Sequence, residues 1–360
     1  MKRVFITDLE GPISKNDNAF EITAHTIPQG EGFFTIISRY DDVLADVVKK
    51  PGYKAGDTLK LILPFLKAYG ETNESIKKYS AEHILLIAGA KKALQSINSA
   101  MPSYIVSTSY EQYVHALCEL IGFPKKNAYC TKLDLDKYSI SPSEITRLKE
   151  VKEEILQMPV IEIPKGAKSL NDFPPELREA VKRLDEIFWS EIPMTTVGRI
   201  LEEVNPVGGF EKVNSVQDII EKIGTGLADV MYVGDSITDA PVFQNVRASG
   251  GLTVSFNGNA YAIREAEIAV MSENAVVTAI LADVFNKSGK EGVLGLVKEW
   301  DSTALKRFGA EESLYQWASE LYPQRLPAVE IITDENRNIL SEKSSAFRKS
   351  VRGVGIGALG

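Results

Sequence analysis

Four short motifs contain side chains that could take part in catalysis or ligand binding. They are widely separated along the chain. The first, Asp8-Leu9-Glu10-Gly11, places two carboxylates two residues apart directly after an apolar run. One carboxylate can attack an electrophile while the other transfers protons, and the glycine allows a tight turn between them. Alone, an Asp-x-Glu-Gly turn is weak evidence for a catalytic site, since the same residues are common in loops without a catalytic role.

A second acidic motif, Gly234-Asp235-Ser236-Ile237-Thr238-Asp239, follows another apolar run and carries two carboxylates four residues apart. Beside the first pair, these side chains would form an oxygen-rich cluster of the kind that Mg²⁺ prefers. In a structural interpretation, Asp239 merely caps the following helix. Capping explains Asp239 but not Asp235, so we favour the metal-binding interpretation.

Two further motifs offer groups that could bind a phosphoryl group. Ser107 and Thr108 end an apolar run, where a hydroxyl and neighbouring amides could hold a phosphoryl oxygen. Lys212 begins a helical pattern after two glycines, and its ammonium could neutralise both a phosphoryl group and an attacking carboxylate. Lys132 and Lys222 are alternative candidates for this role, but nothing beyond their expected solvent exposure supports either of them.

The side chains of these motifs can meet only if the strands that precede them lie next to one another in a sheet. Four β-type runs are followed by polar residues and then by helical stretches such as Tyr113 to Leu120 and Ala240 to Val246. The runs are Val4 to Thr7, Ser103 to Val106, Val230 to Val233 and Leu252 to Phe256. This alternation predicts an α/β fold with a doubly wound parallel sheet, in which ligands bind at the carboxyl ends of the strands.

Three stretches with helical patterns interrupt or extend that sheet. The helical pattern of residues 16–81 predicts a helical insertion. The pattern of residues 136–200 predicts a second one, which begins with a capping box at Ser141, Pro142 and Glu144. Residues 286–360 predict a helical extension that includes Val293 to Trp300 and Glu312 to Leu321. It ends in a basic tail, Arg337 to Arg352, which we interpret as a solvated, partly ordered terminus rather than a partner contact.

The order of the four motifs resembles that of the haloacid dehalogenase (HAD) superfamily, most closely its phosphoserine-phosphatase-like members. The resemblance implies a Rossmann-like catalytic core made of residues 1–15, 82–135 and 201–285. Family members carry caps after the first motif, so we interpret residues 16–81 as a cap. Residues 136–200 could form a second cap or pack elsewhere. The motif resemblance itself does not explain the cap, the second insertion or the extension of residues 286–360.

The resemblance also implies roles for single residues. Asp8 would attack phosphorus and form an aspartyl-phosphate, while Glu10 would act as general acid and base. Ser107, Thr108 and Gly11 would bind the phosphoryl group, and Lys212 would neutralise charge. Magnesium would be the cofactor, with Asp8, the Glu10 carbonyl and Asp235 as ligands and Asp239 in support. Most family phosphatases carry Asp at the position of Glu10 and Thr or Val at that of Pro12, whereas enolase-phosphatases also have Glu.

Arg39 is the single arginine of the first insertion, where family caps read the leaving group. Its guanidinium could bind a substrate carboxylate through two hydrogen bonds. A surface ion pair with Asp42 or Asp46 is the simpler interpretation, and we favour it.

The composition narrows the classes of partner. The net charge of −8 disfavours binding to nucleic acid or to lipid head groups, and no apolar run approaches the length of a membrane helix. Two cysteines and three histidines form no zinc motif. A GxGxxG match at 355–360 has no following helix and does not predict a dinucleotide site. We therefore expect a cytoplasmic protein without membrane or nucleic-acid partners.

The function predicted on these grounds is a magnesium-dependent phosphatase acting on a small phosphorylated metabolite. Two other functions stay open. A phosphotransferase or mutase would use the same aspartyl-phosphate, and a non-turnover scaffold would use only the fold. In favour of the scaffold, the sequence weakly resembles archaeal proteins named as a subunit of an energy-converting hydrogenase. The intact set of Asp8, Lys212, Asp235 and Asp239 argues against an inactive site. The sequence predicts neither the substrate nor the oligomeric state.

Overall fold

A computed structural model describes residues 2–359 and shows one seven-stranded sheet with the strand order β3-β2-β1-β4-β5-β6-β7. Neighbouring strands are parallel throughout, except that β7 runs antiparallel to β6. The strands are β1 (Val4–Thr7), β2 (Ser103–Tyr110), β3 (Ala128–Thr131), β4 (Val230–Gly234), β5 (Leu252–Phe256), β6 (Ile268–Met271) and β7 (Ala328–Ile331). The predicted α/β class with a mainly parallel sheet is confirmed.

The central strand β1 is buried along its whole length because helices cover both faces of the sheet. Phe5 packs in the hydrophobic cluster on one face and Ile6 in the cluster on the other, as the two-residue period of a strand requires. The first face is covered by α6 (Ala90–Ala100), α7 (Glu111–Ile121) and α14 (Val276–Lys298). The second is covered by α11 (Phe210–Ile223), α12 (Ala240–Ala248) and α13 (Ala260–Glu265).

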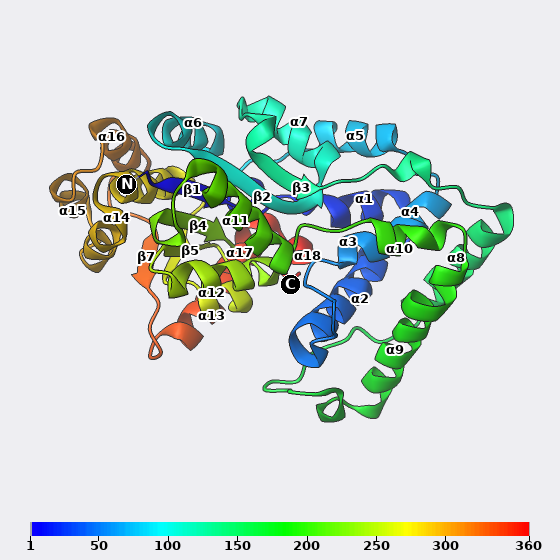
Figure 1. The fold of residues 1–360 in the computed structure, drawn as a ribbon. Helices are drawn as coiled ribbons and strands as arrows, with labels where there is room; N and C mark the ends of the chain where they lie inside the picture. Colours follow the sequence, from blue (N-terminus) through cyan, green and yellow to red (C-terminus); the bar gives the residue numbers. More distant parts are fainter. Residues whose placement is uncertain (1, 360) are drawn as a thin grey trace.

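The two insertions form one helical body beside the sheet (Figure 1). The first insertion contains α1 (Asn18–Thr26), α2 (Gly30–Asp42), α3 (Thr58–Leu61), α4 (Leu63–Ala68) and α5 (Asn73–Glu82), with the π-helical η1 (Val43–Val48) after α2. The second contains α8 (Pro142–Leu156), α9 (Pro175–Glu186) and α10 (Ile200–Glu203). A single hydrophobic cluster joins Phe33 and Phe65 of the first insertion to Phe188 of the second. We call this body the cap.

Helix α8 begins with the predicted capping box. The Ser141 hydroxyl accepts a hydrogen bond from the Glu144 amide, and the Glu144 carboxylate accepts one from the Ser141 amide. Pro142 occupies the first turn, where its missing amide hydrogen costs nothing. Helix α8 therefore begins where the sequence predicts, and it packs against α2 and α4 rather than covering the sheet separately.

The C-terminal region differs from the prediction in two ways. Besides α15 (Ser302–Arg307) and α16 (Glu312–Leu321), it contributes β7 to the sheet, where we expected helices alone. The basic tail is not a solvated terminus but helix α17 (Arg337–Arg352), followed by α18 (Val354–Gly357). Four residues spaced by four form its buried face: Leu340, Ser344, Arg348 and Arg352. Residue 360, the last glycine of the GxGxxG match, lies outside the described residues.

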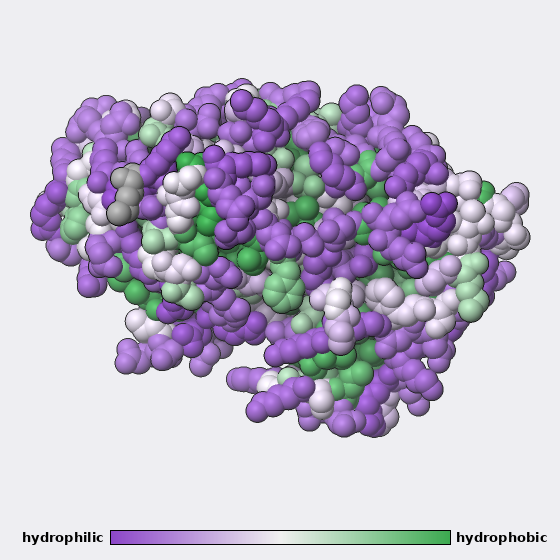
Figure 2. Space-filling view, viewed as in Figure 1, coloured by the Kyte–Doolittle hydropathy of each residue, from purple (hydrophilic) through white to green (hydrophobic). Residues whose placement is uncertain are grey.

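The surface of the protein is mostly hydrophilic on the face shown in Figure 2, where apolar groups appear as small separate patches. Among residues 2–359, no helix combines the length and the apolar character needed to span a membrane.

Candidate active site

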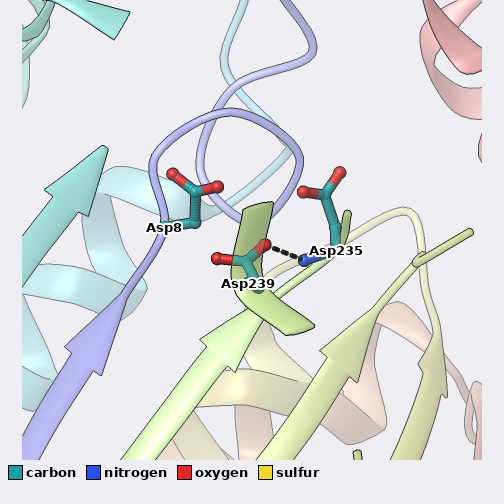
Figure 3. A group of neighbouring side chains, drawn as sticks. All are labelled: Asp8, Asp235 and Asp239. Carbon is teal, nitrogen blue, oxygen red and sulfur yellow. Dashed lines mark hydrogen bonds between the residues drawn. The ribbon is translucent and has the colours of Figure 1, made fainter. Parts of the chain in front are cut away.

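Three carboxylates lie together where β1 and β4 end. Asp8 directly follows β1, and Asp235 and Asp239 follow β4, the strand paired with β1. One oxygen of each carboxylate lies within 4.8 Å of the others, and all three side chains are buried (Figure 3). The predicted juxtaposition of the first and second acidic motifs is therefore present.

Gly11 allows the loop after β1 to approach the loop after β4. Its φ of +96° is accessible to glycine at little cost. A Cβ atom at this position would lie 2.0 Å from Oδ2 of Asp235, closer than any real contact. The glycine is thus required by the packing of the two acidic loops, whatever further part its amide plays in phosphoryl binding.

Lys212 joins two of the three carboxylates. It lies in the first turn of α11, is fully buried, and its Nζ donates hydrogen bonds to Asp8 Oδ2 at 2.6 Å and Asp239 Oδ1 at 2.7 Å. Burial alone would lower the pKa of Lys212, but the two carboxylates raise it above its usual range. Burial raises the pKa of Asp8 to about 7, and Lys212 opposes that rise by favouring the ionised form.

Both oxygens of Asp239 are already occupied by hydrogen bonds. Oδ1 accepts from Lys212 and from the Tyr232 hydroxyl at 2.7 Å, while Oδ2 accepts from the amides of Asp235 at 2.9 Å and Ser236 at 3.1 Å. Its side chain makes no cap to α12, so the simple capping interpretation does not describe it. Asp239 orients Lys212 and fixes the loop that carries Asp235.

Glu10 lies in the same cleft as Asp8. Its Oε1 accepts a hydrogen bond of 2.7 Å from the amide of Asn18, the first residue of α1. Burial, with the neighbouring charge of Asp17, raises the pKa of Glu10 well above its usual range. A raised pKa favours the protonated form of the carboxyl group, which is the form a general acid requires.

Ser107 and Thr108 line the cleft from β2, which extends beyond the predicted end to Tyr110. The pairing of β2 with β3 is irregular between Val106 and Tyr110, so the strand bends where it meets the cleft. The Ser107 hydroxyl accepts a hydrogen bond of 3.2 Å from the Ser109 amide. The Thr108 hydroxyl is buried and has no hydrogen-bond partner among the described residues.

Three basic residues weighed from the sequence lie elsewhere. Arg39 is not among the residues lining the cleft and pairs with Asp42 at 3.2 Å, the predicted partner, although Asp42 is buried and the pair is not a surface one. The other terminal nitrogen of Arg39 donates to the Ala358 carbonyl at 2.6 Å. Lys132 pairs with Glu111, and Lys222 pairs with Asp218 on exposed surface. Only Lys212 of the candidate lysines reaches the acidic cluster.

Two arginines of α17 reach the cluster, and the sequence analysis missed them. Arg348 donates from Nη1 to Oδ2 of Asp235, and Arg352 donates to the same oxygen at 3.0 Å. Arg352 also donates to the carbonyls of Lys15, at 2.9 Å, and Asn16. The signal that could have found them is the spacing of four residues that puts both on the face of α17 shared with Leu340.

The cap supplies the opposite wall of the cleft. Asp17 accepts a hydrogen bond from the Phe20 amide at the start of α1 and lines the cleft beside Glu10. The other cap residues of this wall come mainly from α2 and α3; they are Phe34, Ser38, Asp41, Asp42, Gly56, Thr58 and Leu59. Residues 136–200 contribute none of the lining, which places the second insertion behind the first.

The oxygen-rich donor set fits a hard cation such as Mg²⁺. Asp8 and Asp235 each offer a carboxylate oxygen, and these two oxygens lie within 4.8 Å of each other. Asp239 fits only as a supporting group because its oxygens already accept four hydrogen bonds. Oδ2 of Asp235 is held by the two arginines, a feature considered further below.

The fold has been seen before in solved structures. The chain is similar to gene product AF1437 from Archaeoglobus fulgidus, with 27% identity and a TM-score of 0.80 over 100% of this chain and 99% of the other. A substrate-bound phosphoserine phosphatase complex matches at 15% identity, with a TM-score of 0.46 over 78% of this chain and 97% of that one. A phospho-aspartyl intermediate analogue of phosphoserine phosphatase matches at 14% identity, with a TM-score of 0.44 over the same shares. These two likenesses are too distant to assign an activity. No family model and no curated protein matches the chain.

Proposed function

We propose that this protein is a phosphatase that hydrolyses a small phosphorylated metabolite through an aspartyl-phosphate. The observation that carries the proposal is the buried carboxylate of Asp8, held at the end of β1 by Lys212 and facing the same cleft as Glu10. Phosphoryl transfer asks mainly for positioning and charge neutralisation, and both are available at this site.

Asp8 is the nucleophile in this scheme. The hydrogen bond from Lys212 to its Oδ2 favours the ionised form and orients the carboxylate in the cleft. A carboxylate oxygen of Asp8 forms a bond to phosphorus while the bond from phosphorus to the leaving oxygen breaks. The ammonium of Lys212 then balances the negative charge of the phosphoryl group.

Glu10 moves the protons. Burial raises its pKa and so favours the protonated form, which can give its proton to the leaving oxygen. The resulting carboxylate then takes a proton from water as that water attacks phosphorus and releases Asp8. The hydrogen bond from the Asn18 amide holds Glu10 in place and couples the acid to the first helix of the cap.

The remaining cleft residues would bind the phosphoryl oxygens and the cation. The hydroxyls of Ser107 and Thr108 and the loop at Gly11 are the candidates for the oxygens. Asp8, Asp235 and the Glu10 carbonyl would hold Mg²⁺, which when bound supplies positive charge to the phosphoryl group. Asp239 would keep Lys212 and the Asp235 loop in place.

The test is phosphate release by the purified protein from an aryl phosphate and a panel of small phosphorylated metabolites, with Mg²⁺ or with a chelator. We expect magnesium-dependent release that Asp8→Asn abolishes and that Asp334→Asn, at a site 91% exposed, leaves unchanged. Release that persists in Asp8→Asn would rule out this mechanism. Transfer to an added hydroxyl acceptor in place of water would identify a phosphotransferase instead.

A further inference from the structure

The arginine pair of α17 occupies one carboxylate oxygen of Asp235, a residue that the proposed function uses as a cation ligand. Oδ2 of Asp235 accepts from Nη1 of Arg348 and from Nη1 of Arg352, and all three side chains are almost completely buried. Oδ2 also lies against Gly11, where even an added methyl group would collide with it. This oxygen is therefore enclosed by two guanidinium groups and a backbone turn.

The position of α17 does not depend on these two contacts. Leu340 packs in the hydrophobic cluster on one face of the sheet, and the Ser344 hydroxyl donates to the Gly258 carbonyl at 2.6 Å. Beyond the helix, Leu359 packs in the cap cluster. The backbone is thus anchored on both sides of the arginines, so their side chains can move while the helix stays in place.

Arg348 is the less completely bound of the two. Its Nε is buried and has no hydrogen-bond acceptor among the described residues, although the side chain lines the cleft. Arg352 is held more firmly, because Nε and Nη2 donate to the carbonyls of Lys15 and Asn16. A guanidinium with an unused donor beside the cleft is the group that can be displaced toward a new anionic partner.

We propose that Arg348 competes with the divalent cation for Asp235. The inference rests on the proposed function, in which Asp235 is a cation ligand. A cation cannot share Oδ2 with two guanidinium groups, since like charges this close repel strongly in a buried site. In the cation-free protein Arg348 holds Asp235, and cation binding moves this guanidinium off Oδ2 into the cleft. There it is available to an anionic oxygen of the substrate.

The test measures cation affinity directly, by calorimetric titration of Mn²⁺ into the full-length protein. We expect Arg348→Met to bind Mn²⁺ at least ten times more tightly than the wild type, because the competitor is gone. Lys349→Met removes the same charge from the exposed neighbouring position and should change the affinity less than twofold. Equal or weaker binding by Arg348→Met would overturn the competition.

Two further measurements keep the interpretation clear. If Arg348→Met does not fold, Arg348→Lys replaces it. Lysine lacks the planar guanidinium and should hold Asp235 less well, so this variant should bind Mn²⁺ more tightly than the wild type does. An Mn²⁺ affinity no higher than that of the wild type would contradict the proposal. Phosphate release is assayed in parallel. Asp8-dependent release without tighter Mn²⁺ binding overturns the competition alone, whereas absence of Mn²⁺ binding to every variant also removes the metal from the proposed function.

Discussion

At the scale of single residues, the buried charges depend on one another. Lys212 is the sole cation that contacts Asp8 among the described residues, and it also holds Asp239. Asp235 has a separate pair of cations on α17. The acidic cluster is thus neutralised from two sides by elements distant in the sequence. Each cation offsets the cost of burying the carboxylate that it contacts.

Replacing Lys212 by methionine should damage stability and activity together. The change leaves Asp8 and Asp239 buried without their cation, which costs about 3–5 kcal/mol of unfolding free energy. Loss of the charge that balances the phosphoryl group should lower kcat by at least about 100-fold. Urea unfolding and phosphate release measure the two effects. Lys222→Met, on the same helix but 61% exposed, is the control and should leave the free energy of unfolding unchanged. A folded Lys212→Met protein with normal turnover would contradict the assigned role.

At the scale of elements, the strands that lead into the chemical motifs, β1, β2 and β4, were predictable, as was the five-residue strand β5. The bounds of β1 and β5 are those of the runs Val4 to Thr7 and Leu252 to Phe256, because buried parallel strands are continuously apolar. Strands β3, β6 and β7 were not predicted. A run of four residues such as Ile268–Met271 has too little pattern of its own to distinguish a strand from part of a helix, and it does not lead into one of the four motifs, as the equally short β1 does.

Helix α17 was misjudged for a different physical reason. Its buried face carries two arginines, and arginine is mostly found at the surface unless it is paired. The partner of both, Asp235, lies more than a hundred residues earlier in the chain. Nothing local to residues 337–352 therefore distinguishes a solvated charge from a paired one. By contrast, Asp8, Lys212, Asp235 and Asp239 were predicted as a group, because strand ends and motif order placed them at one edge.

Helix α2 carries an acid whose burial should make stability depend on pH. Asp41 is buried, accepts from the Tyr53 hydroxyl at 2.5 Å and the Gly56 amide at 2.9 Å, and burial raises its pKa to about 7. An unfolded Asp titrates near pH 3.9. Between these values the folded state keeps a proton that the unfolded state has lost. The stability of the wild type therefore falls as the pH rises from about 4 to about 7.

Asp41→Asn removes this proton, so its stability relative to the wild type should rise with pH. The relative gain from pH 5 to pH 8 should be on the order of 2–3 kcal/mol. Urea unfolding at the two pH values measures it. Asp334→Asn, at an exposed position, should show no such trend. A difference between Asp41→Asn and wild type that is the same at both pH values would contradict the raised pKa.

At the scale of the whole molecule, the C-terminal region connects the sheet and the cap. Helix α17 packs on the sheet through Leu340, while Leu359 packs in the cap cluster and Arg39 of α2 donates to the Ala358 carbonyl. The cleft lies between the two bodies that this segment connects. The C-terminal extension, which the family resemblance does not explain, thus contributes both to the site and to the placement of its cap wall.

The second insertion does not line the cleft and supports it only through the hydrophobic core of the cap. Replacing Phe188 tests this arrangement. This residue is fully buried and packs against Tyr40, with ring centroids 5.9 Å apart, and Phe65, at 6.2 Å. Phe188→Ala should lower the free energy of unfolding by about 3–5 kcal/mol because it leaves a cavity between the insertions. The loosened cap wall should raise KM, whereas Mn²⁺ affinity should stay within twofold, since Asp8 and Asp235 belong to the sheet. Met194→Ala, 88% exposed in the same insertion, is the control. A fall in Mn²⁺ affinity equal to the rise in KM would mean that the second insertion supports the carboxylates directly, contrary to the arrangement described.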